Sequence, residues 1–161
     1  MKCLIFSDSH RNTRNMREAL SRNPDAEVVF FLGDGLSDAE LVSSGDTARA
    51  WLTVAGNCDY EPVFRGSLVK KTEAITLEGR RIVFTHGDLY GAKYGRGGLL
   101  RLATDASADV VLFGHTHEPT ERYETLSDGG VYLFNPGSIG AGSYGLLLLI
   151  DGEILLSHGK I

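Results

Sequence analysis

Residue types that bind divalent metal ions follow directly after five short, mainly apolar runs of the sequence. The seven side chains are Asp8, His10, Asp34, Asn57, His86, His115 and His117. Four of the five histidines of the chain belong to this set, and His158 alone lies elsewhere. Because imidazoles, carboxylates and amide oxygens are common metal ligands, the pattern predicts one shared metal site.

Each of these segments also has an ordinary structural explanation when it is taken alone. Asp8 in an Asp-Ser-His segment is most often part of a helix-capping loop, and Asp34 after a glycine is most often a simple turn. Asn57 is a common turn residue, and His86 has the position of a hydrogen-bonded histidine at a strand end. The Gly-His-Thr-His segment at 114–117 is harder to explain by packing. The metal site is therefore predicted from the conjunction of the segments.

The mixture of ligands constrains the metal. Imidazole together with carboxylate suits Mn, Fe, Ni or Zn better than Ca or Mg. Seven ligands are too many for one four-coordinate ion that keeps an open position, so two ions are expected. A pair about 3.5 to 4 Å apart activates water and stabilises phosphorus during in-line attack. We therefore expect hydrolysis of a phosphate ester by a water molecule activated by two metal ions, with Mn as the first choice and Ni, Fe or Zn as alternatives.

Apolar periodicity predicts the elements that position these residues. Strand patterns at 3–6, 28–32 and 51–55 alternate with helical patterns at 13–22, which begins with a Thr cap, and 36–43. This βαβαβ beginning predicts a parallel sheet. Since the carboxyl ends of such strands form the crevice where ligands bind, the ligand segments should meet in space.

The rest of the chain predicts a mixed sheet system. A helical pattern at 99–106 interrupts a series of strand patterns at 74–77, 80–85, 110–113, 121–125, 131–134, 145–150 and 154–158. Turn residues at 78–79, 127–130 and 151–152 indicate antiparallel hairpins. Without any repeat or linker, the pattern predicts one α/β domain over residues 1–161.

Charge and apolar content limit the partners. The formal net charge is −5, which argues against duplex nucleic acid as a partner, because such binding needs a patch of Lys and Arg. No apolar run approaches the roughly 20 residues that cross a bilayer, and the first one is too short for a signal peptide. Cys3 and Cys58 are expected to be too far apart for a disulfide. We expect a cytoplasmic protein that acts on a small phosphate ester, with a homo-oligomer left open.

As an ordered set, these motifs resemble the calcineurin-like metallophosphoesterases, most closely the small bacterial and archaeal branch of YfcE-type phosphodiesterases. The likeness runs from residues 8–10 to the Asn-Pro-Gly-Ser segment at 135–138. The resemblance implies a sandwich of two mixed β-sheets flanked by helices. It also implies the ligands, namely Asp8, His10 and His117 for the first metal, Asn57, His86 and His115 for the second, and Asp34 as a bridge between them. Residues 135–138, which read first as a turn, would by resemblance form a wall near the metals.

One position departs from larger members of the family, which carry a His after the motif Asn where this chain has Cys58. That His is thought to assist the leaving group, and the small branch often has Cys instead. We interpret Cys58 as a packing residue, with proton donation by its thiol as the alternative. Asp59 is a candidate partner outside the ligands. The charges of Lys93, Arg96 and Arg101 either contact the substrate or are solvated.

The function expected is a metal-dependent phosphodiesterase whose catalytic residues are Asp34, Asn57 and His86, with Cys58 as a further candidate. A non-catalytic scaffold of the retromer-subunit type would have broken ligand positions, and every ligand position here holds a competent residue type. A phosphomonoesterase or nucleotide pyrophosphatase with the same metals stays open, because loops of unknown shape recognise the rest of the substrate.

Overall fold

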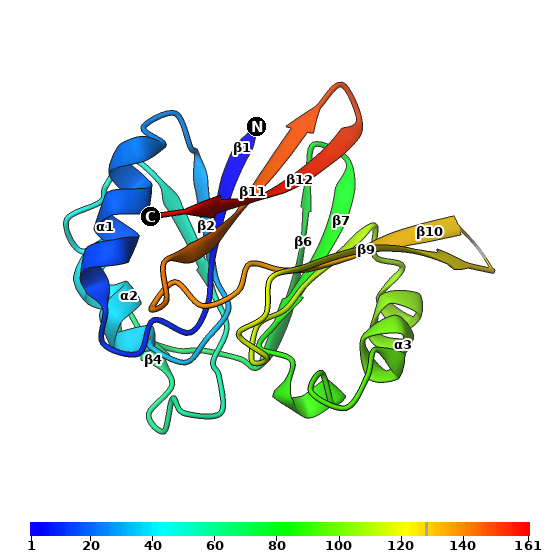
Figure 1. The fold of residues 1–161 in the computed structure, drawn as a ribbon, viewed down its shortest axis with the longest axis horizontal. Helices are drawn as coiled ribbons and strands as arrows, with labels where there is room; N and C mark the ends of the chain where they lie inside the picture. The colour runs from blue at the N-terminus through cyan, green and yellow to red at the C-terminus, as the bar shows by residue number, and fades with distance from the viewer. Residues whose placement is uncertain (128) are drawn as a thin grey trace.

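The apolar runs near the start of the chain form the first of two β-sheets (Figure 1). The computed structural model describes residues 1–127 and 129–161. Helices α1 (Thr13–Arg22) and α2 (Leu36–Ser43) connect the parallel strands β1 (Lys2–Phe6), β2 (Val28–Phe31) and β3 (Ala50–Thr53). The antiparallel strands β11 (Ser143–Ile150) and β12 (Glu153–Lys160) complete the order β12-β11-β1-β2-β3.

The second sheet has five strands in the order β6-β7-β8-β10-β9. They are β6 (Thr72–Leu77), β7 (Arg80–Thr85), β8 (Val110–Leu112), β9 (Thr120–Leu126) and β10 (Gly129–Asn135). The central strands β7, β8 and β10 are parallel, and β6 and β9 pair antiparallel at the two edges. The 3-10 turn η1 (Asp88–Tyr90) and helix α3 (Gly97–Ala106) connect β7 to β8. A short hairpin of β4 (Val63–Phe64) and β5 (Ser67–Leu68) precedes β6.

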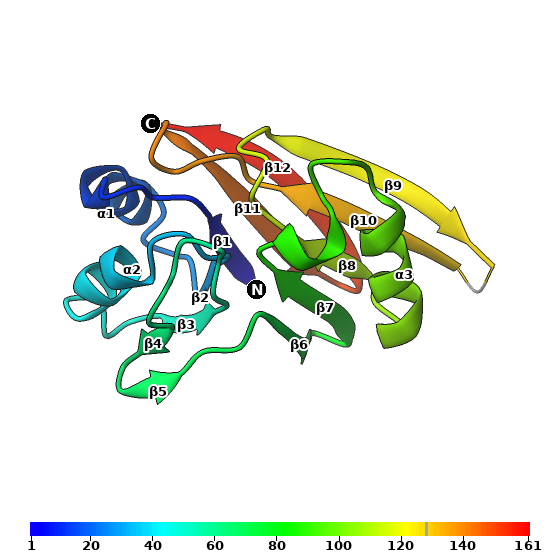
Figure 2. The same cartoon turned by 90° about the horizontal axis from the view of Figure 1, so that it is seen from below.

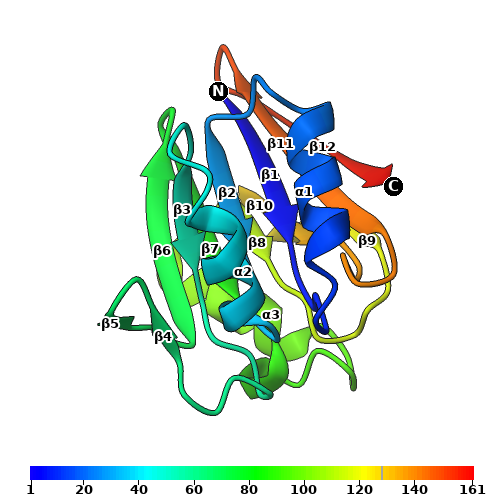
Figure 3. The same ribbon diagram turned by 90° about the vertical axis from the view of Figure 1, so that its left-hand side faces the viewer.

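Alternation of side chains along the strands explains the layers. Leu4 and Phe6 of β1 join the apolar cluster under α1 and α2, whereas Cys3 and Ile5 join the cluster between the sheets. Figure 2 shows the resulting order of helices, first sheet, second sheet and α3. Figure 3 shows α1 and α2 side by side over the first sheet. The parallel strands β1, β2 and β8 are thus buried on two faces, as their continuous apolar runs require.

The predicted elements are largely confirmed, and the fold is the two-sheet sandwich that the family resemblance implied. The bounds of α1, α2 and β7 agree with the predictions. The expected Thr cap is wrong, because Asn12 caps α1 by accepting from Asn15 N at 3.3 Å. The hairpin of β4 and β5 was not expected, and two-residue strands are too short for a periodic signal. In the turn predicted at 127–130, residue 128 lies outside the described residues.

Two further expectations concern thiols and membranes. Cys3 is buried and Cys58 is exposed, and both are free thiols. Within residues 1–127 and 129–161, no helix has the length and apolar character needed to cross a membrane.

Candidate metal centre

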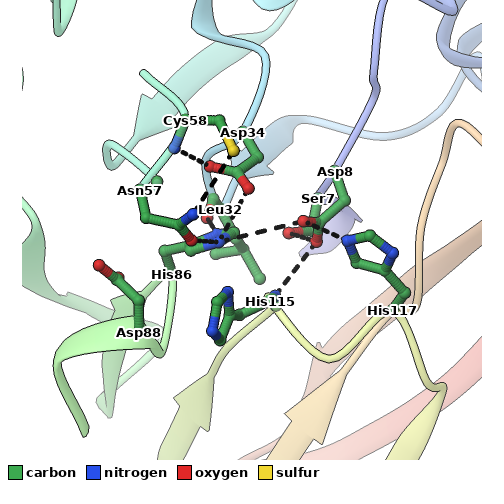
Figure 4. A network of polar contacts seen from close by, with 12 residues as sticks. Ser7, Asp8, Leu32, Asp34, Asn57, Cys58, His86, Asp88, His115 and His117 are labelled. Atoms are coloured by element: carbon green, nitrogen blue, oxygen red, sulfur yellow. Dashed lines mark hydrogen bonds and ion pairs between the residues drawn. The ribbon is translucent and has the colours of Figure 1, made fainter. Parts of the chain in front are cut away.

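The predicted ligands lie together at the carboxyl ends of β1, β2, β3, β7 and β8, and Figure 4 labels each of them except His10. Backbone hydrogen bonds join the loops that carry them. Asp8 N donates to Gly33 O at 3.0 Å, and Gly114 N donates to His86 O at 2.9 Å. Gly33 and Gly56 touch so closely that a Cβ on Gly33 would overlap Gly56 N, so this approach requires glycine. Segments spread over more than 100 residues therefore form one site.

Asp8 is buried at the centre of the site, and one of its oxygens lacks a hydrogen bond. Oδ2 accepts from Ser7 Oγ and from His115 N, whereas Oδ1 has no hydrogen-bond partner among the described residues. The nitrogen atoms nearest to Oδ1 are His117 Nε2 at 3.1 Å and His86 Nε2 at 4.0 Å. Because buried polar atoms in proteins are nearly always paired, this oxygen fits the role of a cation ligand.

His10 and His117 complete a group of three ligand atoms around Asp8. Their Nε2 atoms lie 3.2 Å apart, and each imidazole is exposed on its outer side. The atoms from Asp8, His10 and His117 all lie within 4.8 Å of one another. Two imidazole nitrogens and a carboxylate oxygen at this spacing form a donor set of the kind that divalent transition metals prefer.

His86 is fully buried, and its hydrogen bonds define which nitrogen is free. Nδ1 donates to Leu32 O at 2.8 Å, so the lone pair is on Nε2. Nε2 faces three oxygens, Asn57 Oδ1 at 3.1 Å, Asp34 Oδ2 at 3.3 Å and Asp8 Oδ1 at 4.0 Å. A lone pair surrounded by oxygen acceptors is repelled unless a cation or a proton lies between them. Asp8, Asp34 and His86 thus form a second close group.

Without a metal, the carboxylates around His86 favour a proton on its imidazole, at the place that would also fit a cation. Burial lowers the pKa of the His86 imidazole, but the hydrogen bond with Asp34 and the charges of Asp8 and Asp34 outweigh it, and the pKa is raised. Burial raises the pKa of the Asp34 carboxyl, but the hydrogen bond from His86 and that from Cys58 N at 2.8 Å outweigh it, and the pKa is lowered. Asp34 is therefore a carboxylate at neutral pH.

The remaining predicted ligands lie beside His86. The rings of His115 and His86 are 5.0 Å apart between centroids. Burial, the charge of His86 and the charge of Lys93 lower the pKa of the His115 imidazole, which keeps it neutral and able to bind a metal. All seven predicted ligands are thus brought together. Asp8 is the residue common to both close groups, and its Oδ1 lies near Nε2 of both His117 and His86. The role of Asp34 as a bridge stays a prediction.

Most of the predicted ligands have a left-handed backbone conformation with positive φ, which sets the direction of their side chains. Five of the ten non-glycine residues with positive φ among the described residues are predicted ligands: Asp8 at 55°, His10 at 46°, Asp34 at 57°, His115 at 67° and His117 at 63°. Such conformations cost about 1 to 3 kcal/mol each and are found where the surrounding structure holds a functional geometry. Apolar periodicity gave no sign of them.

Residues that hold the loops are a second set that the sequence only partly indicated. Asn135 Nδ2 donates to Gly114 O at 2.8 Å and to Thr116 Oγ1 at 3.0 Å, and Ser138 Oγ donates to Asp8 O at 2.7 Å. The segment at 135–138 is therefore hydrogen-bonded to two loops that carry predicted ligands, the loop after β1 and the loop after β8.

Of the basic residues Lys93, Arg96 and Arg101, Lys93 is the one whose charge acts on a predicted ligand. Arg96 pairs with Glu124 at 2.7 Å, and Arg101 lines a separate cavity of about 520 Å³ between η1 and α3. The charge of Lys93 acts on His115.

Asp88 is a further residue near the site, and it is not among the ligands predicted from the sequence. It has a buried Oδ1 without a hydrogen-bond partner among the described residues, and its Oδ2 lies 4.0 Å from Lys71 Nζ.

Comparisons with known proteins agree with this geometry. A family model described as the calcineurin-like phosphoesterase superfamily domain matches residues 1–149. YsnB of Bacillus subtilis, described as a probable metallophosphoesterase, is 33% identical over 139 residues, which are 86% of this chain and 75% of that protein. Phosphodiesterase MJ0936 of Methanocaldococcus jannaschii is 25% identical over 149 residues, which are 85% of this chain and 83% of that protein. The solved structure of a predicted phosphoesterase from Streptococcus pneumoniae has a TM-score of 0.75 at 22% identity, covering 99% of this chain and 88% of that chain.

Proposed function

Since the chain belongs to the calcineurin-like phosphoesterase superfamily, we propose that it is a phosphodiesterase that hydrolyses a small phosphate diester with two divalent metal ions as cofactors. The observation that carries the proposal is the buried Oδ1 of Asp8, which has no hydrogen-bond partner among the described residues and lies 3.1 Å from His117 Nε2 and 4.0 Å from His86 Nε2. The 25% identity with an archaeal phosphodiesterase supports a diester as substrate.

The proposal assigns each ligand to one of two positions. The first metal position is formed by Asp8, His10 and His117, and the second by Asn57, His86 and His115. Asp34 is proposed as the ligand shared by both. Two carboxylates against two dications leave a formal charge of about +2, which attracts phosphate. We propose Mn as the native metal, with Ni, Fe or Zn as alternatives.

Bound ions would lower the pKa of a water molecule and offset the charge that develops on phosphate. The chain's own contribution is to hold the ligands ready. The bond from His86 Nδ1 to Leu32 O fixes the imidazole, and the bond from Cys58 N fixes the Asp34 carboxylate. His10, Asn57, Cys58 and His117 are exposed, so a small ester would approach from their side. Lys93, whose charge already acts on His115, is proposed to attract the phosphate.

A non-catalytic scaffold explains the site less well than a hydrolase does, because all seven ligand positions hold side chains that can bind metal and that lie together. Three of these ligands, His10, His115 and His117, have a left-handed backbone conformation, and the Nε2 atoms of His10 and His117 lie 3.2 Å apart.

Hydrolysis by metal-stripped protein to which Mn, Ni, Fe(II) or Zn is restored tests the proposal. Bis(p-nitrophenyl) phosphate, p-nitrophenyl phosphate and a nucleotide diphosphate are the three substrates, and metal content is measured in parallel. We expect two ions per chain and the fastest turnover with the diester. One ion per chain under excess Mn, with Asn57 and His86 free of metal in anomalous scattering, would contradict the two-metal assignment. Faster turnover of the monoester or of the diphosphate would contradict the diester assignment.

A further inference from the structure

Two carboxylates outside the ligand set, Asp59 and Asp38, hold the loops that carry the ligands. Asp59 accepts four backbone N–H groups. Its Oδ2 accepts from Asp34 N and Gly56 N, both at 2.8 Å, and its Oδ1 accepts from Gly35 N at 2.9 Å and Leu36 N at 3.0 Å. A single side chain thus ties the loop after β2 to the loop after β3.

The loop after β2 needs such an acceptor because of its conformation. Gly33, Asp34 and Gly35 all have positive φ, at 96°, 57° and 138°. Successive N–H groups in such turns point into one concavity that binds an anion. Gly35, the N-cap of α2, has no side chain to accept the first N–H groups of the helix, and Asp59 supplies the acceptor from the next loop. Asp59 therefore fixes the backbone of Asp34 and, through Gly56 N, the approach to Asn57.

Asp38 does the same for the loop after β1. Its Oδ2 accepts from Ser9 Oγ at 2.6 Å and from Arg11 N at 2.8 Å. These two residues flank His10, and His10 and Arg11 have positive φ, at 46° and 67°. Asp38 lies on α2, so a helix that covers the first sheet holds both neighbours of a first-position ligand, Ser9 by its side chain and Arg11 by its backbone.

We propose that Asp38 and Asp59 are positioning residues that divide the two-metal site between them. Asp38 holds the first metal position through the side chain of Ser9 and the backbone of Arg11, which flank His10. Asp59 acts mainly on the second position, because its bonds fix the backbone that leads to Asn57 as well as the loop of Asp34, the ligand proposed to be shared by both ions. This rests on the proposed two-metal function, to which it adds which outer residue controls which ion.

The hydrogen bonds give the two carboxylates different tolerances. Asp59 uses both oxygens, and an Asn side chain has one oxygen and an NH₂ group that would face N–H donors. Asp38 uses one oxygen for both bonds, and the amide oxygen of Asn can accept both. Asp59→Asn should therefore disturb its loop, Asp38→Asn should be tolerated, and Asp38→Ala should disturb the other loop.

Titration of the metal-stripped full chain with Mn tests this division. Isothermal calorimetry gives the two affinities, and anomalous scattering gives the occupancy of each position. Replacement of partners outside the ligands typically weakens metal binding 10- to 100-fold. We expect a loss of about that size at the second position in Asp59→Asn, with a smaller loss at the first position through the shared Asp34, and a loss of about that size at the first position in Asp38→Ala, with Asp38→Asn within about threefold of the wild type. Asp105→Asn, which removes an exposed carboxylate on α3, is the control for charge alone.

Thermal unfolding of the metal-free variants separates positioning from general stability. Equal weakening of both ions in Asp59→Asn and Asp38→Ala, in proportion to a lowered Tm, would overturn the inference, and so would unchanged affinities. Where Asp59→Asn does not fold, Asp59→Glu keeps both oxygens at a shifted place and should still weaken the second ion more than the first. A wild type that binds fewer than two ions would instead refute the proposed function.

Discussion

Replacing Asp34 by Asn separates the role of the carboxylate from the role of the loop that carries it. Asp34 is almost completely buried, and its two oxygens have different neighbours, Cys58 N at 2.8 Å and His86 Nε2 at 3.3 Å. In Asp34→Asn the amide oxygen keeps the bond from Cys58 N, and the NH₂ group then faces the metal positions. The fold is therefore retained, while the ligand proposed to be shared by both ions is lost.

The size of the effect follows from the two contacts that are removed. A charge-assisted contact contributes about 1.5 to 3 kcal/mol, which corresponds to about 10- to 150-fold in an equilibrium constant. If both ions lose such a contact, the population with both ions bound falls about 100- to 20,000-fold. Turnover of bis(p-nitrophenyl) phosphate at fixed, limiting Mn should fall by the same order.

Cys58→Ala is the contrasting variant. Its thiol is exposed, and its side chain contacts Asn57 Nδ2 at 3.4 Å, a weak interaction. Partial burial raises the pKa of the Cys58 thiol, and the hydrogen bond with Asp34 and the negative charge of Asp34 raise it further. The thiol is therefore neutral in the metal-free protein. We expect a loss of less than about threefold, because at most a packing contact or an inefficient proton donor is removed.

The assay is turnover as a function of Mn concentration for both variants and for Asp105→Asn, with circular dichroism to check the fold. Comparable residual activity of Asp34→Asn and Cys58→Ala would refute the assignment of Asp34 as a shared ligand. Full recovery of Asp34→Asn at high Mn would show that the carboxylate contributes affinity alone and has no role in the reaction.

Three more outcomes follow from the same site and its support. Aryl diesters should react much faster than alkyl diesters in single turnovers, and Cys58→His should gain most on the poorer leaving groups; rates insensitive to leaving-group pKa would contradict this. Because the pKa of His86 is raised despite its burial, Mn affinity in calorimetry should increase as the pH rises through that pKa. The Tm of the metal-free protein should decrease over the same pH range, since a raised folded-state pKa adds stability that is lost as the pH rises. If Tm and Mn affinity both increased with pH, the pairing of His86 with Asp34 would be contradicted. Phe30→Ala, which removes a buried ring in edge contact with Phe84 between the sheets, should cost about 3 to 5 kcal/mol of unfolding free energy in urea without changing metal stoichiometry.

Local patterns were sufficient to predict most of the secondary structure. The bounds of α1 and α2 agree with the apolar spacing of the sequence, because one face of each helix is buried and the other is solvated. The parallel order of β1, β2 and β3 follows from the alternation of strands and helices. The pairing of β10 with β8 and of β11 with β1 joins distant segments, and no local pattern specifies it.

The sequence by itself determined the identity of the candidate ligands. Asp8, Asp34 and His86 each follow a buried strand, and the carboxyl ends of such strands converge in this class of fold. Residue type and position relative to a strand are local properties, and a local pattern of residues is therefore sufficient to predict them.

Only the tertiary structure decided how these side chains are aimed and what holds them. The bonds that Asp59 accepts from Asp34 N and that Asp38 accepts from Arg11 N join segments that neither periodicity nor composition connects. The structure also assigned Arg96 to Glu124 and away from the ligands. These choices depend on distances between segments far apart in the chain, and such distances exist only after the two sheets have packed.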